Sequence, residues 1–313
     1  MALQKTHTAA VEEISRPSWM SWLHKHSRYL FVAPMLIYTI IMMAYPIVSN
    51  VQTSLYDVDV ATFRSGDAPF IGLGNYRELL NNPAFLKSTA LSLTFTSISI
   101  FLQFSIGFGL ALFFNQSFPG NGILRAMLLL AWLLPSVVVG NIFRWMLDGD
   151  YGPLNYFLQS AGLLSAKQYW LLSPKTALLG VILANAWVGI PFSMILLLAG
   201  LQNISPTLYE AANIDGASGW QRFQSITLPL MRPVALGILL LTFIYTFKVF
   251  DLIYIMTKGG PVDSTTVLPI YTFKLSFDFF RFGDGAAAAT VLLVGLLSLA
   301  VGYSRIIRAE EAA

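Results

Sequence analysis

The chain contains six long runs of apolar residues that are separated by short polar segments. A helix needs about 20 apolar residues to cross the hydrocarbon core of a bilayer. Each run is long enough, so the pattern predicts an all-α membrane protein with six transmembrane helices and both termini on one side. The predicted spans are 29–48, 89–114, 124–147, 176–201, 234–256 and 286–307.

Composition supports a membrane protein and excludes several kinds of site. Of the 313 residues 56% are hydrophobic and 11% charged, against about 25% charged in a typical soluble domain. The chain has no Cys, and its three His residues all precede the first predicted span, so we expect no metal site. A net charge of +3, widely spread, does not indicate a nucleic-acid partner.

Basic residues near the first span set the expected orientation. Lys5, Arg16, Lys25 and Arg28 precede it, which predicts a cytoplasmic N-terminus. With six spans the C-terminal tail 308–313 is then cytoplasmic too, and the protein is expected to cross its membrane several times. Residues 1–28 would form a cytoplasmic tail, either an amphipathic helix on the inner leaflet or a poorly ordered segment.

The longest inward connection, residues 202–232, contains start and stop signals for two short helices. A polar cap followed by proline starts a helix, glycine in the left-handed region ends one, and a proline terminates the next. The signals are Ser205 with Pro206, Gly216, a capping box of Ser218 and Gln221, and finally Pro229.

One face of the first of these helices is narrow. Leu208, Ala211, Ala212 and Asp215 share that face, and Glu210 lies to one side with its charge free. Two alanines form a thin ridge that would fit closely into a groove of another protein. The alternative is a helix hairpin that packs back on its own bundle, and the pattern alone does not choose between them.

The spacing in this segment resembles the EAA loop of ABC-importer permeases. It reads Glu210-Ala211-Ala212, three residues, Gly216, nine residues, Ile226, one residue and Leu228-Pro229. Further segments resemble the carbohydrate branch of that family, and together they cover roughly residues 29–307. They are Ala44-Tyr45-Pro46-Ile47, the run Phe70 to Tyr76, Asp215-Gly216-Ala217, Phe223, Phe250-Asp251, Thr257 to Pro261 and Phe282-Gly283.

The resemblance implies a type I importer bundle in the bacterial inner membrane and a set of partners. These are a second, homologous permease, a dimer of ATPase subunits and an extracytoplasmic solute-binding protein. The chain has no GxxxxGK(S/T) string, so it is not expected to bind ATP through a P-loop. The resemblance implies a permease component that is not itself an enzyme, with ATP and Mg²⁺ bound by the ATPase partner. The family's coupling helix docks on that ATPase, which implies a coupling site of Glu210, Ala211, Ala212, Asp215 and Gly216.

Polar and aromatic residues inside two spans are candidates for a sugar path, because buried polar groups in a membrane are costly without a function. In the fourth span they are Asn185 and Trp187, near Pro191, which is expected to interrupt the helix; in the fifth they are Tyr245, Phe247, Lys248 and Asp251. Lys248 and Asp251 are expected to offset one another on one helix face. They could also form a structural ion pair that faces a partner subunit, or be exposed to lipid.

Other functions remain open for the same pattern. A permease for another solute, such as glycerol phosphate or a polyol, would keep the whole architecture. A secondary transporter would need coupling acids near the bilayer midplane, where Asp251 is the sole acid well inside a predicted span. A membrane enzyme would need a clustered nucleophile, base or metal set, which the sequence does not offer.

Overall fold

The computed structural model describes residues 18–311, and the chain divides into two compact units, Met1–Asn50 and Val51–Ala313. Helix α1 (Ser18–Thr53) makes up the described part of the first unit, and only its last turn enters the second. Of the predicted tail, residues 1–17 lie outside the described residues. Residues 18–28 are helical and continuous with the first span.

The prediction of an all-α membrane protein is confirmed. Within residues 18–311 the structure contains no β-strand, only an isolated bridge between Tyr56 and Phe70. Five helices are long and apolar enough to cross a membrane, and a bent helix pair would make a sixth span. The five are Phe31–Thr53, Pro83–Phe114, Ala177–Gln202, Gly219–Phe247 and Phe282–Arg305.

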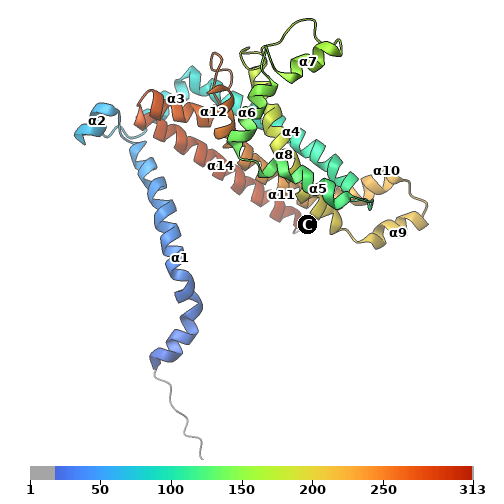
Figure 1. The fold of residues 1–313 in the computed structure, drawn as a ribbon. Helices are drawn as coiled ribbons and strands as arrows, with labels where there is room; N and C mark the ends of the chain where they lie inside the picture. Colours follow the sequence, from blue (N-terminus) through green and yellow to red (C-terminus); the bar gives the residue numbers. More distant parts are fainter. Residues whose placement is uncertain (1–17, 312–313) are drawn as a thin grey trace, which may run out of the picture. The chain divides into compact units, whose positions relative to one another are not determined.

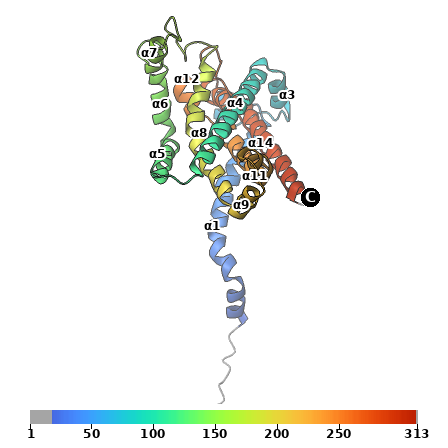
Figure 2. The same ribbon diagram turned by 90° about the vertical axis from the view of Figure 1, so that its right-hand side faces the viewer.

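Four long helices lie side by side in the unit Val51–Ala313 (Figures 1 and 2). They are α4 (Pro83–Phe114), α8 (Ala177–Gln202), α11 (Leu228–Phe247) and α14 (Phe282–Glu311). Helices α4 and α8 approach closely at Gly107, where a Cβ would lie 2.9 Å from the Cβ of Ser193. Gly107 is thus a helix-contact residue, as expected for small residues in membranes, whereas a Cβ at Gly109 would meet nothing within 4 Å.

The third predicted span is not one straight helix, which corrects the prediction for 124–147. It consists of α5 (Asn121–Leu133) and α6 (Ser136–Met146), which meet at 94°. The cause lies at Pro135, since a proline pushes the preceding residue into extended backbone, and Leu134 has φ −70° and ψ 137°. In contrast, α8 continues through Pro191, where an interruption was predicted.

The fifth predicted span also differs from expectation at both ends. Pro229 does not terminate a separate helix: α10 (Gly219–Arg222), the π-helical turn η1 (Phe223–Thr227) and α11 follow one another directly. In the wider turn the Leu228 N–H donates to the Phe223 carbonyl, five residues back. Pro229 therefore lies in the first turn of α11, where a proline does not interrupt the helix. At the far end α11 stops at Phe247, and a short α12 (Asp251–Thr257) follows.

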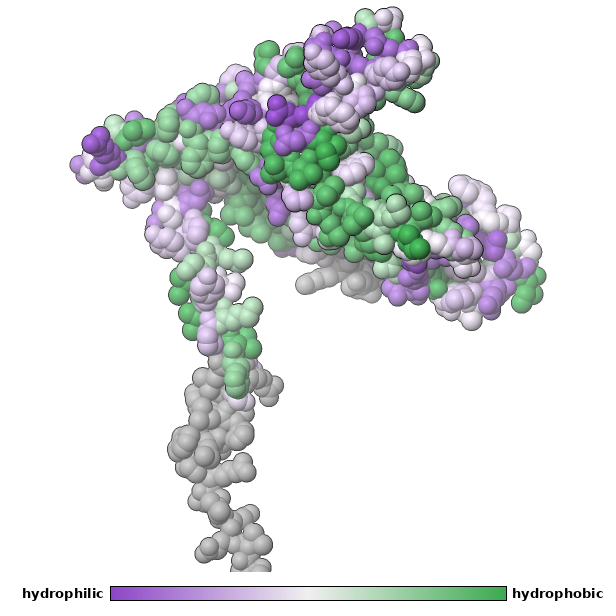
Figure 3. Space-filling model, in the orientation of Figure 1, coloured by the Kyte–Doolittle hydropathy of each residue, from purple (hydrophilic) through white to green (hydrophobic). Residues whose placement is uncertain are grey.

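Shorter elements occupy the two ends of this unit. Helices α3 (Gly74–Asn81) and α12 lie at one end, and α9 (Pro206–Ile214) with α10 at the other (Figure 1). Figure 3 shows hydrophobic residues over the middle of this body, with hydrophilic residues gathered around α7 and around α9 and α10. The remaining elements are α2 (Val60–Ser65), α7 (Pro153–Ser160), α13 (Leu268–Phe273) and η2 (Lys274–Asp278).

Two of the segments that carried the family resemblance meet near α3. The side chain of Asn75 donates hydrogen bonds to the carbonyls of Ser54 (2.9 Å) and Tyr56 (3.0 Å). The backbone N–H of Gly283 donates to the Val58 carbonyl at 2.9 Å. The chain from Ser54 to Val58 is therefore held between α3 and the start of α14.

Candidate functional sites

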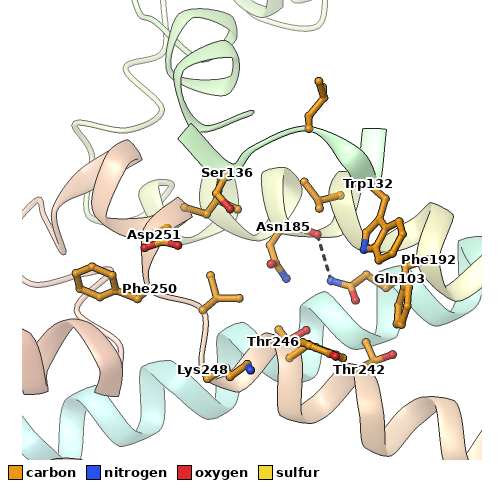
Figure 4. Close-up of a pocket in the computed structure, with 16 residues that line it drawn as sticks. Gln103, Trp132, Ser136, Asn185, Phe192, Thr242, Thr246, Lys248, Phe250 and Asp251 are labelled. Atoms are coloured by element: carbon orange, nitrogen blue, oxygen red, sulfur yellow. Dashed lines mark hydrogen bonds between the residues drawn. The ribbon is translucent and has the colours of Figure 1, made fainter. Parts of the chain in front are cut away.

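A cavity of about 420 Å³ lies where the two helix breaks face α8. One wall comes from the α5–α6 bend, with Trp132 and Ser136, and another from the end of α11 and the start of α12. Helices α4 and α8 supply the rest (Figure 4). Broken helices expose backbone and side-chain polar groups at membrane depth, which is typical of a solute site.

Three buried neutral polar residues face this cavity. Asn185 is 7% exposed and Thr242 4%, and neither the Asn185 Nδ2 nor the Thr242 Oγ1 has a hydrogen-bond partner in the protein. Gln103, on α4, donates from Nε2 to the Asn185 backbone carbonyl at 3.2 Å (Figure 4). A buried unpaired donor or acceptor costs about 1–3 kcal/mol, so the Asn185 Nδ2 and the Thr242 Oγ1 are candidates for hydrogen bonds to a polar solute.

Lys248 and Asp251 both line the cavity but do not share a helix face, which corrects the sequence-based expectation. Lys248 has φ −92° and ψ 5°, values that end α11, and Asp251 starts α12 after the break. Among the described residues no ion pair joins them; the Lys248 ammonium instead lies 5.0 Å from the centre of the Tyr245 ring. Neither charge is therefore neutralised by the other within the protein.

Two predicted path residues lie elsewhere. Trp187 is not among the cavity residues; its ring meets Phe143 edge-on at 5.8 Å. Phe247 stacks on Phe243 at 5.3 Å and packs against the cluster around Leu79 and Tyr271. The predicted residues that the structure does bring together at the cavity are Asn185, Tyr245, Lys248 and Asp251.

Other polar and aromatic residues line the cavity that were not predicted from the sequence as path residues. They include Gln103, Trp132, Ser136, Phe192, Thr242 and Thr246. The Trp132 and Phe192 rings stack at 5.3 Å, and Phe192 meets Tyr245 edge-on at 6.0 Å. A usable signal for Gln103 was present in α4, where buried polar side chains recur every three or four residues at Ser88, Ser92, Thr96, Ser99 and Gln103.

The predicted coupling loop, residues 202–232, folds largely as its capping signals predicted. Pro206 starts α9 after Ser205, although the Ser205 hydroxyl bonds the Thr207 hydroxyl at 2.7 Å rather than capping the helix. Gly216 has φ 78°, and the Ala217 N–H bonds the Ala212 carbonyl at 2.9 Å, which closes the helix end. The capping box of Ser218 and Gln221 is confirmed, with bonds of 2.7 and 3.3 Å.

Helix α9 buries none of its residues against the rest of the chain. Glu210, Ala211, Asp215 and Gly216 are exposed and Ala212 is half-buried. The helix is held by the Tyr209 hydroxyl, 2.9 Å from the Thr227 hydroxyl, and by a hydrogen bond from Arg222 to Asn213. Large apolar side chains nearby are exposed as well: Leu208 45%, Ile214 87% and Trp220 64%.

No group of three or more His, Cys, Asp or Glu residues that could hold a metal ion occurs in the described part of the chain.

Comparison with known proteins identifies relatives along most of the chain. The permease MalF of a trehalose/maltose transport system from Thermococcus litoralis is 36% identical, over 89% of this chain and 92% of its own length. The sulfoquinovosyl glycerol permease SmoG of Agrobacterium fabrum is 35% identical, over 96% and 97%. The diacetylchitobiose permease DasB of Streptomyces coelicolor is 30% identical, over 90% and 87%.

Solved structures show the same fold. The crystal structure of a bacterial ABC transporter that imports the acidic polysaccharide alginate contains a chain with a TM-score of 0.79 and 24% identity. The match covers 93% of this chain and 98% of that one. A family model described as "Binding-protein-dependent transport system inner membrane component" matches residues 103–305. The chain therefore belongs to this family of multi-pass inner-membrane permeases of ABC importers, as its coupling loop predicted.

Proposed function

We propose that this chain is a sugar-translocating permease subunit of a binding-protein-dependent ABC importer. Three relatives carry names that specify glycans or glycosides: trehalose/maltose, sulfoquinovosyl glycerol and diacetylchitobiose. The observation that carries the proposal is the combination, in one chain, of an exposed coupling helix and a cavity with unpaired polar groups at two helix breaks.

In this proposal the chain performs no catalysis, and energy comes from ATP hydrolysis with Mg²⁺ on a dimer of separate ATPase subunits. A second, homologous permease completes the membrane pathway, and an extracytoplasmic solute-binding protein delivers the sugar. The α9 end of the molecule faces the cytoplasm, as the basic residues before the first span predict.

Coupling requires that α9 move with the ATPase and that its motion reach the bundle. The ridge formed by the exposed Ala211 and the half-buried Ala212 would fit a groove on the partner, and the exposed Glu210 would supply a charged contact. The motion would pass through the Tyr209–Thr227 hydrogen bond into η1 and α11, which run on directly to the cavity. Closure of the ATPase dimer would then rock α11 as a rigid body.

The cavity is the proposed cargo path. Asn185, Thr242 and Gln103 supply hydrogen bonds to sugar hydroxyls, and Trp132, Phe192 and Tyr245 supply apolar faces for the carbon side of a sugar ring. Lys248 and Asp251 add charged hydrogen-bonding groups. Trp187 and Phe247 would act through packing, since they lie outside the cavity.

The test is charge reversal on the coupling helix. Glu210→Lys should abolish uptake of radiolabelled maltose, trehalose and diacetylchitobiose by cells that express the whole importer, while the protein stays in the membrane. The matched control is Asp67→Lys, which reverses an exposed acid before α3 and should leave uptake unchanged. Full uptake with Glu210→Lys would refute the coupling role.

A further inference from the structure

We propose that the cavity selects sugars without net charge, because its own ionisable groups are a separated and balanced pair. This inference rests on the proposed function, since it assumes that the cavity holds the cargo. We call Lys248 and Asp251 the charge pair. Lys248 is the one ammonium or guanidinium and Asp251 the one carboxylate among the described residues that line the cavity.

The charge pair is held apart by the backbone. Lys248 ends α11, and its ammonium lies 5.0 Å from the centre of the Tyr245 ring. Asp251 begins α12 on the other side of the break (Figure 4). If Lys248 and Asp251 formed a direct ion pair, their hydrogen-bonding atoms would be occupied by one another and few would be left for a solute. In this geometry one charge meets a solute from the α11 side and the opposite charge from the α12 side.

A charged solute disturbs this balance. An anionic sugar could pair with Lys248, but it would leave Asp251 without a counter-charge and bring two like charges into a cavity at membrane depth. A cationic amino sugar could pair with Asp251, but it would leave Lys248 without a counter-charge and bring two positive charges together. A neutral sugar leaves the balance intact, because hydroxyl groups accept hydrogen bonds from the ammonium and donate them to the carboxylate.

The remaining lining also suits a neutral polyhydroxy solute. The Asn185 Nδ2 and the Thr242 Oγ1 are buried and without a partner in the protein, and both residues line the cavity. These are neutral groups, and Thr242 can both donate and accept. The aromatic rings of Trp132, Phe192 and Tyr245 also line the cavity and offer apolar surface but no charge.

The experiment measures binding to the assembled importer in nanodiscs, without the external binding protein, so that the cavity alone is tested. The probes are maltose and trehalose, each compared with the uronate in which one hydroxymethyl group is oxidised to a carboxylate. We expect the dissociation constant of the uronate to be larger by about tenfold or more, since like charges brought together at an interface are strongly unfavourable. Equal or tighter binding of the uronates would overturn the charge rule but leave the cavity as the cargo site.

Two variants separate the charge rule from a general loss of folding. Asp251→Asn leaves Lys248 unbalanced and should shift the preference towards the uronate by about tenfold. The double variant Lys248→Met/Asp251→Asn is neutral again and should prefer the neutral sugar, as the wild type does. An unchanged preference in Asp251→Asn would overturn the inference. If no sugar bound to the wild type, both the charge rule and the proposed cargo path would be overturned.

Discussion

Gln103 on α4 and Asn185 on α8 are joined across 82 residues of sequence by a hydrogen bond of 3.2 Å, from the Gln103 Nε2 to the Asn185 backbone carbonyl. The Gln103 amide lies directly over Gly189, where a Cβ would come within 2.3 Å of the Gln103 Cδ. The glycine thus makes room for an amide that fixes α8 at the level of the cavity. Gln103 is a positioning residue for Asn185.

This relationship predicts that Gly189→Ala will displace the Gln103 side chain. The atoms that the new Cβ would meet are the flexible end of the Gln103 side chain, so the cost is mainly the lost hydrogen bond to the Asn185 carbonyl, about 0.5–1.5 kcal/mol. The melting temperature of the purified protein and sugar uptake should therefore both decrease. The control is Gly109→Ala on α4, where a Cβ meets nothing within 4 Å and alanine favours the helix. Equal melting temperatures of the two variants would show that the Gln103 side chain can move aside without loss of stability.

The cavity shows why the sequence predicted only part of the site. The length of the apolar runs located the spans. The rotation of α8, which places Asn185 at the cavity and Trp187 outside it, depends on how α4 and α8 pack. The composition of a single span does not contain that information. Pro135 was a readable signal for the bend in the third span. The end of α11 at Phe247 carries no proline or glycine signal, because the next residues are Lys248, Val249 and Phe250.

Gly283 is required for the clamp on the segment from Ser54 to Val58. A Cβ at this position would lie 2.4 Å from the Tyr56 carbonyl oxygen and 3.0 Å from the Asn75 Nδ2. The first of these is a backbone atom, which cannot rotate away. We therefore expect Gly283→Ala to destabilise the protein by about 1–3 kcal/mol, measured as a lower melting temperature. Gly295→Ala, also on α14 but with open space around it, should not.

The coupling loop was the most predictable part of the molecule, because its signals are local. The left-handed Gly216, the proline at the start of α9 and the Ser218 capping box all act within a few residues of chain. The prediction for Pro229 was wrong because the π turn before it depends on continuation into α11. The caps and turns of the loop can be predicted from a few residues of sequence, whereas the way the loop joins α11 is set by packing in the bundle.

Gly216 yields a prediction about coupling. Its φ of 78° costs a residue with a Cβ roughly 1–2 kcal/mol, while asparagine tolerates this region better. Gly216→Val should lower the amount of ATPase subunit that copurifies with the permease, together with uptake, because the end of α9 shifts. Gly216→Asn should retain most of both. Since a Cβ at this position meets nothing within 4 Å, a similar loss in both variants would point to a cause other than backbone strain.

The loop after α12 should respond to acid through Asp263. Its carboxylate accepts hydrogen bonds from the Lys274 Nζ at 2.7 Å and the Thr266 hydroxyl at 2.9 Å. The bond from Lys274, followed by that from Thr266, holds the pKa of Asp263 below its ordinary value of 3.8. Because the pKa is lower in the folded protein, the stabilisation is fully present above pH 3.8 and is lost as the pH falls through the folded-state pKa.

Removing the lysine should remove much of this pH dependence. In Lys274→Met the pKa of Asp263 rises back towards its ordinary value, so the melting temperature of the variant should fall less steeply below pH 3.8 than that of the wild type. The control is Lys167→Met, which breaks an exposed pair with Asp150 at 3.3 Å and should keep the wild-type slope. Parallel melting curves for Lys274→Met and the wild type across this pH range would show that the Asp263 contact does not contribute to folding stability.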